Sequence, residues 1–163
     1  MISPRSERVI NVVVAGLGGQ GVLKASDILA EAVFDAGWDV KKADVHGMSQ
    51  RGGSVRSDVR FGPRVFSPMV TAGEADFLVV LAEDQVQPHR HVLRSGGTLL
   101  TPDSIAADRL PNRRSVNVAI LGVLSRALGV EPKFWLEAIR NNFRESLRAE
   151  NLQAFEIGRE MAK

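Results

Sequence analysis

The first strong pattern in the chain is an almost unbroken apolar run over residues 9–15, rich in β-branched side chains. Such a run is typical of a strand buried on both faces of a sheet. Glycines within residues 16–21 predict a turn, and apolar residues at helical spacing predict a helix over residues 22–36. Gly37 is placed to end that helix in the left-handed conformation. Residues 38–45 then predict a second strand, so the first unit is expected to be β-α-β.

The next pattern departs from a parallel α/β repeat. Over residues 55–61, apolar or small residues alternate with arginine and aspartate. This alternation predicts a strand with one covered face and one charged face. Gly62-Pro63 predicts a turn, with residues 64–66 returning as the partner of a β-hairpin. The hairpin is therefore expected as an insertion after the first β-α-β unit.

The rest of the pattern adds two buried strands and three helices. The strands are expected at residues 77–81 and 98–100, and the helices at 116–128, from Pro132 onward, and at 151–162. Together these elements predict an α/β fold. We expect one three-layer α/β/α domain spanning residues 1–163, with a mixed sheet, a Rossmann-like β-α-β start and the inserted β-hairpin.

Composition and charge narrow the classes of protein. With 163 residues, the chain is long enough to bury about 70% of its unfolded surface. The net charge is only +2, so no nucleic-acid partner is expected. No apolar run reaches the roughly 20 residues that span a bilayer, and the polar first eight residues lack a signal-peptide core. A cytoplasmic protein with no membrane partner is expected. Cysteine is absent, so the chain cannot hold an iron–sulfur cluster on thiolates.

One glycine motif is typical of dinucleotide-binding proteins. Gly16, Gly18 and Gly21 satisfy G-x-G-x-x-G between a strand and a helix, where backbone can approach a pyrophosphate. Asp44 lies at roughly the offset of a ribose-binding acid. A stand-alone NAD- or FAD-binding Rossmann-like protein is therefore one hypothesis. The short chain and the interrupting hairpin count against it, and the glycines would equally serve close packing of helix on sheet.

A second glycine-rich segment, residues 46–55, has no standard catalytic interpretation. No G-x-S-x-G elbow is present, and His46, His89 and His91 do not have the spacing of metal ligands. No catalytic residue and no metal site are expected. Arg51, flanked by Gly52 and Gly53, either meets a carboxylate or phosphate or braces the loop through backbone carbonyls.

The two motifs, in this order and spacing, resemble the gamma subunit or domain of the 2-oxoacid (pyruvate):ferredoxin oxidoreductases, and within them the small beta subunits of the indolepyruvate enzymes. The motifs are Gly16-Leu17-Gly18-Gly19-Gln20-Gly21 and His46-Gly47-Met48-Ser49-Gln50-Arg51-Gly52-Gly53-Ser54-Val55. The resemblance extends over nearly the whole chain, through Val65-Phe66-Ser67-Pro68, Gly73-Glu74-Ala75-Asp76, Asn117 with Leu121-Gly122, and the segment from Glu150 to Gly158.

The resemblance implies a role as one component of a larger enzyme. Enzymes of this family decarboxylate a 2-oxoacid oxidatively with coenzyme A, and they yield an acyl-CoA and reduced ferredoxin. Their thiamine diphosphate, magnesium and iron–sulfur clusters lie on other subunits or domains. This sequence also lacks the Gly-Asp-Gly…Asn signature that holds thiamine diphosphate. We therefore expect a non-catalytic small subunit that binds none of these cofactors alone, with indolepyruvate or another arylpyruvate as the substrate of the complex.

The expected partner is a large catalytic subunit that carries thiamine diphosphate and iron–sulfur clusters, in a hetero-oligomer that passes electrons to ferredoxin. The glycine loops are the expected surface toward that partner or a ligand. Their residues are Gly16, Gly18, Gly19, Gln20, Gly21, His46, Gly47, Met48, Gln50, Arg51, Gly52 and Gly53.

Overall fold

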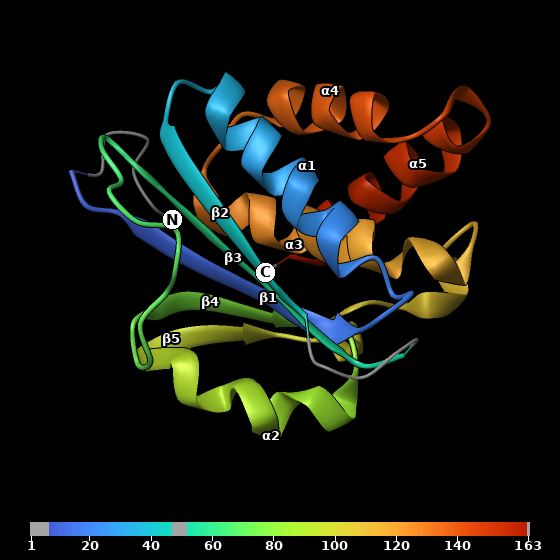
Figure 1. The fold of residues 1–163 in the computed structure, drawn as a ribbon. Coiled ribbons are helices and arrows are strands. Elements are labelled where there is room, and N and C mark those ends of the chain that lie inside the picture. Colours follow the sequence, from blue (N-terminus) through green and yellow to red (C-terminus); the bar gives the residue numbers. More distant parts are fainter. Residues whose placement is uncertain (1–6, 47–51, 163) are drawn as a thin grey trace.

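A five-stranded mixed sheet forms the centre of the protein. The computed structural model describes residues 7–46 and 52–162. The strands are β1 (Ile10–Leu17), β2 (Asp39–His46), β3 (Ser54–Gly62), β4 (Ala75–Val80) and β5 (Leu93–Leu100). Their order across the sheet is β2-β3-β1-β4-β5. β3 is antiparallel to both of its neighbours, whereas β4 is parallel to β1 and β5 (Figure 1). The predicted mixed sheet is confirmed.

Helices cover the two faces of the sheet unequally. On one face lie α1 (Val22–Asp35), α3 (Val116–Leu128), α4 (Pro132–Asn142) and α5 (Glu145–Met161). On the other, here called the second face, the short α2 (Val86–His89) is the one α-helix of the described residues that lies against β4 and β5 (Figure 1). The three predicted layers are therefore present, but the third is thin. Within residues 7–46 and 52–162, no helix is both long enough and apolar enough to span a bilayer.

β1 explains why the core has two parts. Its central residues Val12, Val13 and Val14 are all fully buried, as the unbroken apolar run predicted. Val12 and Val14 belong to the large cluster under the four helices, whereas Val13 packs with Leu78 and Val80 in a smaller cluster on the second face. Alternate residues of one strand thus anchor both layers.

The β-α-β start has a strand inserted in it. β1 and β2 run in the same direction, but β3 lies between them and is antiparallel to both. α1 therefore leads the chain over one intervening strand. The predicted end of α1 is confirmed, because Gly37 has φ 100°, in the left-handed region.

The predicted hairpin partner of residues 55–61 is wrong. β3 already pairs on both edges, with β1 and with β2, so it leaves residues 64–66 no free edge of β3 to join. The true hairpin is β2–β3. The chain after Gly62 instead lies over the second face, where Val65 and Val70 are buried. The backbone N–H groups of these two residues donate to the carboxylates of Asp39 and Asp58 at 2.7 and 2.8 Å, which replaces strand pairing.

The last helix begins earlier than predicted. α5 starts at Glu145, whereas the sequence pattern predicted Asn151 as its N-cap. Asn151 lies inside the helix, is buried, and donates from Nδ2 to the carbonyl of Leu147 at 2.9 Å. An asparagine whose side chain bonds back four residues is compatible with a helix interior, so its presence did not mark an end. β5 is likewise longer than the three residues that were predicted.

Two glycines allow α3 and α5 to pack backbone against backbone. A Cβ on Gly122 would lie 2.2 Å from the carbonyl oxygen of Phe155, and a Cβ on Gly158 would lie 1.8 Å from that of Ala119. Phe155 stacks on Trp135 of α4 at a centroid distance of 5.8 Å, and both rings are fully buried. The close helix crossing therefore holds the layer that covers β1.

A polar pair links the two strands of the β2–β3 hairpin. Asp44 accepts hydrogen bonds from the hydroxyl of Ser57 at 2.6 Å and from Lys42, which also pairs with Asp27 of α1 at 3.1 Å. Partial burial alone would raise the pKa of Asp44. The hydrogen bonds from Lys42 and Ser57, with the charges of Lys42 and His46, outweigh that burial, so the pKa lies below the ordinary value of an aspartate.

We predict that Gly158→Ala destabilises the protein. Alanine improves intrinsic helix propensity by about 1 kcal/mol. Against this gain, the new methyl group meets a backbone carbonyl that cannot rotate away, and overpacking typically costs about 1–3 kcal/mol. The clash should dominate, so the free energy of unfolding should fall by at least about 1 kcal/mol in chemical denaturation. Gln153→Ala, at an exposed position of the same helix, is the control, and equal stability of the two variants would contradict the close crossing.

We predict that Asp44 contributes stability that is lost in acid. Because its folded pKa is lowered, the contribution is complete above the unfolded pKa of about 3.9 and disappears as the pH falls through the folded pKa. Asp44→Asn should therefore be less stable than wild type at pH 7, and the difference should shrink below about pH 4. Denaturant melts over this pH range measure it. Asp84→Asn, at an exposed position, should show no such convergence.

Candidate functional site

The first glycine loop is a turn that is closed by its own side chain. Gly19 and Gly21 have φ of 89° and 80°, a region that L side chains rarely adopt. The side-chain oxygen of Gln20 accepts from the backbone N–H of Leu17 at 2.8 Å, and its Nε2 donates to the carbonyl of Leu81 at 3.4 Å. The turn is therefore fixed both to the end of β1 and to the chain just after β4.

Asn117 holds the loop from the other side. It lies in the first turn of α3, is 5% exposed, and donates from Nδ2 to the carbonyl of Gly21 at 3.2 Å. A Cβ on Gly21 would lie 2.3 Å from that nitrogen, so Gly21 is required both by its φ and by the space it leaves. The beginnings of α1 and α3 are joined at this point.

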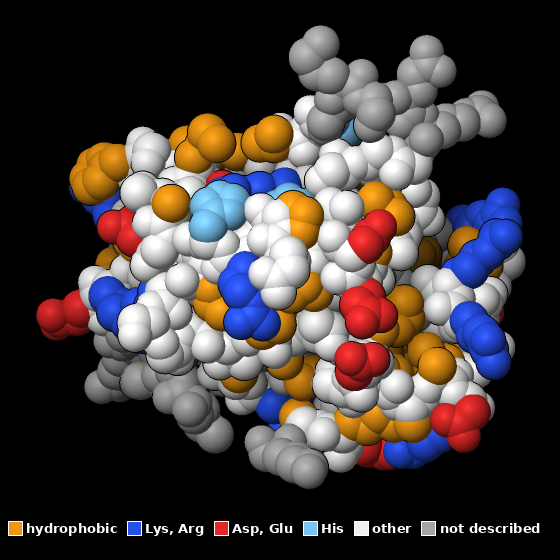
Figure 2. Space-filling model, turned by 90° about the horizontal axis from the view of Figure 1, so that it is seen from below, with side chains coloured by type: hydrophobic (Ala, Val, Ile, Leu, Met, Phe, Trp, Pro, Cys, Tyr) orange, Lys and Arg blue, Asp and Glu red, His pale blue; other side chains and the backbone are white. Residues whose placement is uncertain are grey.

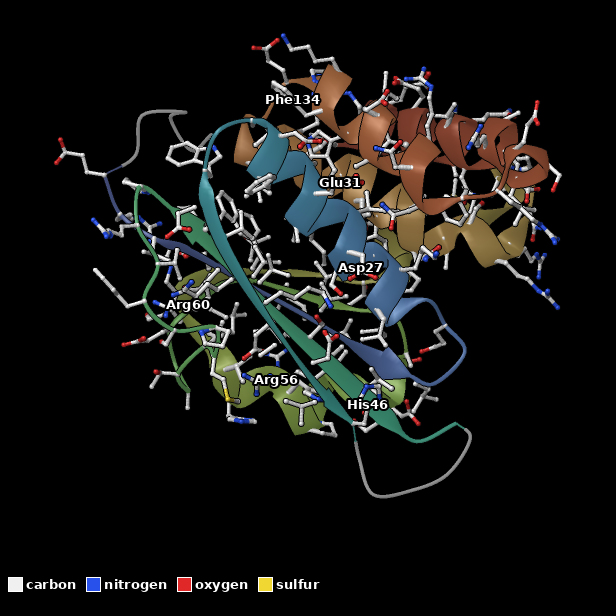
Figure 3. The ribbon with its side chains drawn as sticks, turned by 45° about the horizontal axis from the view of Figure 1, so that its top comes forward. Asp27, Glu31, His46, Arg56, Arg60 and Phe134 are labelled. Carbon is white, nitrogen blue, oxygen red and sulfur yellow. The ribbon has the colours of Figure 1, made fainter. Side chains whose placement is uncertain are left out.

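The structure brings the two glycine motifs together. The backbone N–H of Gly18 donates to the carbonyl of Gly53 at 2.8 Å, and a Cβ on Gly18 would lie 3.3 Å from the nitrogen of Gly52. His46 lies at the exposed end of β2, opposite Val55 at the start of β3 (Figure 3). The other predicted residues of this motif, Gly47, Met48, Gln50 and Arg51, lie outside the described residues.

An open cleft of about 840 Å³ lies beside the first glycine loop. It is bordered by the beginnings of α1, α3 and α5 and by the turn before α3, so segments far apart in sequence meet there. Four basic residues and one acidic residue line it. The lining residues are Gly19, Gln20, Gly21, Lys24, Leu81, Asn112, Arg113, Arg114, Ser115, Val116, Asn117, Phe143, Arg144, Leu147, Glu150 and Asn151.

The electrostatics of the cleft favour an anion. In the part of the chain that the structure describes, α1 and α5 have no side-chain cap, so their first backbone N–H groups keep a partial positive charge. Exposed guanidinium groups of Arg113, Arg114 and Arg144 add full charges at the rim. Lys24 is tied to the rim by a 2.8 Å hydrogen bond to the carbonyl of Asn142. Phosphate or carboxylate is the chemistry that such an arrangement binds.

The same geometry does not favour the dinucleotide hypothesis. A ribose-binding acid would follow a strand adjacent to β1, but here β3 lies between β1 and β2. Asp44 is already engaged by Lys42 and Ser57. Among residues 7–46 and 52–162, no three His, Asp or Glu side chains are grouped to hold a metal ion.

The three cleft arginines were not among the predicted site residues. Their signal in the sequence was the basic pair Arg113-Arg114 directly before a helix start, with Asn112 accepting from the N–H of Arg114 at 2.9 Å. Such a pair is usually a solvated surface. Only the fold shows that the pair lines one cleft with the glycine loop and with Arg144, the residue before a different helix.

Comparison with known families and proteins agrees with this fold. Residues 11–113 match the family described as pyruvate ferredoxin/flavodoxin oxidoreductase. The chain is 45% identical over 93 residues to indolepyruvate oxidoreductase subunit IorB of Pyrococcus horikoshii, covering 56% of this chain and 45% of that relative. The match thus spans less than half the length of the relative.

A second relative aligns almost end to end. The 2-oxoglutarate synthase subunit KorC of Archaeoglobus fulgidus is 31% identical over 173 residues, which covers 96% of this chain and 89% of that protein. Among solved structures, the 2-oxoglutarate:ferredoxin oxidoreductase from Magnetococcus marinus matches with a TM-score of 0.83 at 20% identity. That match covers 96% of this chain and 31% of the longer one. The chain therefore belongs to the pyruvate ferredoxin/flavodoxin oxidoreductase family.

Proposed function

We propose that this chain is the non-catalytic small subunit of a 2-oxoacid:ferredoxin oxidoreductase. Its family and its similarity to IorB and KorC, which are themselves subunits, support that role. The proposed substrate of the complex is indolepyruvate or another arylpyruvate. The identity of 45% to IorB over 93 residues, against 31% to KorC over 173 residues, favours it.

The redox cofactors belong, in this proposal, to a large partner subunit. The 163 residues include no cysteine, so this chain offers no thiolate to an iron–sulfur cluster. The sequence also lacks the Gly-Asp-Gly…Asn signature that holds magnesium and thiamine diphosphate. The partner would supply thiamine diphosphate chemistry, electron transfer and the contact with ferredoxin. This chain would bind the ligand and orient it.

The basic cleft carries the proposal further, because its chemistry suits the phosphates of coenzyme A. The Magnetococcus marinus enzyme was solved with 2-oxoglutarate, coenzyme A and succinyl-CoA bound. Coenzyme A has a pyrophosphate and a 3′-phosphate, and the glycine loop lets such groups approach backbone N–H donors at the start of α1. Arg113, Arg114 and Arg144 would neutralise the remaining charge. A cleft of about 840 Å³ is of the size that holds small molecules.

We predict that this chain is inactive alone and active in a complex. Purified chain, large subunit and the mixture should be assayed with arylpyruvate, coenzyme A, thiamine diphosphate and a viologen acceptor. Only the mixture should reduce the acceptor at full rate, because neither the carbanion stabiliser nor the electron path lies on this chain. Turnover by this chain without a second polypeptide, or an unchanged rate of the large subunit when it is added, would contradict the proposal.

We predict that the double variant Arg113→Ala, Arg114→Ala weakens binding of coenzyme A to the complex. Hydrogen bonds from charged groups contribute about 1.5–3 kcal/mol. The KM for coenzyme A should therefore rise at least tenfold, while the KM for the 2-oxoacid and the assembly of the complex stay unchanged. Arg126→Ala, exposed at the other end of α3, is the control. An unchanged KM for coenzyme A in the double variant would show that its phosphates do not bind in this cleft.

A further inference from the structure

One segment that shares in the family resemblance does not line the cleft. Residues 63–70 lie over the second face of the sheet, and a buried ion pair fixes one end of them. The guanidinium of Arg56 binds the carboxylate of Asp58 through two hydrogen bonds of 2.7 and 2.9 Å, and Asp58 is fully buried. The same two side chains hold Val70, since Asp58 accepts from its N–H at 2.8 Å and Arg56 donates to its carbonyl at 3.1 Å.

The other end is fixed in a similar way. Asp39 accepts from the N–H of Val65 at 2.7 Å. Arg60 donates to the carbonyl and the hydroxyl of Ser67 at 2.8 and 3.0 Å, and its Nε donates to Asn11 at 2.8 Å. Figure 3 shows Arg56 and Arg60 on β3, on the side of the sheet away from α1. The backbone of residues 65–70 is thus held at several points by side chains of β2 and β3.

Between these fixed points, two large apolar side chains point into water. Phe66 is 84% exposed and Met69 is 53% exposed, whereas Val65 and Val70 are 3% and 5% exposed. Only Phe34 and Val45 are comparably exposed large apolar residues among those that the structure describes. Figure 2 views the second face and shows hydrophobic side chains gathered along one edge of it, next to Lys and Arg. Rigid support for exposed apolar groups is typical of a binding surface rather than of a loop that can fold them inward.

Basic side chains around Phe66 and Met69 outnumber acidic ones. Lys41, Arg56, Arg60 and Arg64 lie there, against Asp39 and Asp58. The guanidinium of Arg64 lies over the ring of Phe66 at 5.7 Å from its centroid. Lys41 lies directly opposite Arg60 in the β2–β3 register and so shares its face. Residues 64–70 contain no acidic residue. A complementary surface would therefore be apolar at its centre and acidic at its rim.

We propose that residues 64–70 form a docking knob, which inserts Phe66 and Met69 into an apolar, acid-rimmed socket on the large catalytic subunit. This inference rests on the proposed function. A permanent neighbour fits the preformed, rigid knob, because preorganisation lowers the entropy lost on association. In the Magnetococcus marinus structure the matching region is 31% of one longer chain, so the fold there shares its polypeptide with other parts of the enzyme.

The test is to measure the Kd between this chain and the large subunit for wild type and for the double variant Phe66→Ser, Met69→Ser. The Kd should rise at least tenfold, equal to about 1.4 kcal/mol, with unchanged thermal stability of the isolated chain. Phe34→Ser is the matched control, because Phe34 is 66% exposed on α1 in the opposite layer, and its Kd should stay at the wild-type value. Arg64→Glu should also raise the Kd, because it places a negative charge against an acidic rim.

Each other result would overturn the inference. If the double variant binds like wild type, the knob is not the docking surface, while the proposed function stands. If wild type itself fails to bind the large subunit, the proposed function falls and the knob with it. If sedimentation shows that wild type self-associates and the double variant does not, the occupant is a second copy of this chain.

A photo-crosslinking residue at position 66 should give an adduct with the large subunit, and one at position 34 should not.

Discussion

The structure depends on a turn that passes two other parts of the chain so closely that it has almost no room for side chains. Residues 18–21 leave β1, contact Gly53, the residue before β3, through Gly18, and meet Asn117 of α3 at Gly21. A Cβ on Gly21 would collide with Asn117, and Gly21 also has a left-handed φ of 80°. Because side-chain volume is absent here, α1 and α3 can both begin at this point. The basic cleft exists as a result of that shared origin.

The two faces of the sheet are stabilised by different chemistry. The helical face uses apolar packing, with the close α3–α5 crossing beneath Trp135 and Phe155. Much of the second face has no helix and uses buried carboxylates instead. Asp76, 3% exposed, accepts from Arg94 at 2.8 Å and from the N–H of Asn11 at 2.9 Å. A buried carboxylate is tolerated only when it is paired in this way, so such contacts fix one geometry rather than adding much net stability.

Most of the elements could be predicted from the sequence, because their signals are local. The apolar run of β1, the helical spacing of α1 with Gly37 at its end, and the apolar α3 at residues 116–128 are all confirmed. The pairing of strands, in contrast, has no local signal in the sequence. Nothing in residues 55–61 indicates that β3 is flanked on both sides, so the hairpin was assigned to the wrong partner.

Only the part of the candidate site that has a local sequence signal could be predicted. Both glycine motifs could be found, since glycine has few other uses at a strand end. Arg113, Arg114 and Arg144 could not, because a surface arginine becomes part of a site only through tertiary contacts. Arg144 is also the residue directly before α5, whereas the predicted start at Asn151 placed it seven residues from the beginning of that helix.

β3 joins the two surfaces to which functions have been assigned. Directly before its first residue, Gly53 contacts the glycine loop beside the cleft. Further along, Arg56, Asp58 and Arg60 hold the backbone of residues 65–70. Ser54 and Arg60 are six residues apart, about 20 Å at the rise of a strand. Because β3 is paired along both edges, it cannot bend or slide without breaking two ladders. A partner seated on Phe66 and Met69 would therefore stand at a fixed distance and orientation from any ligand in the cleft, which is what a subunit that positions a substrate for another subunit requires.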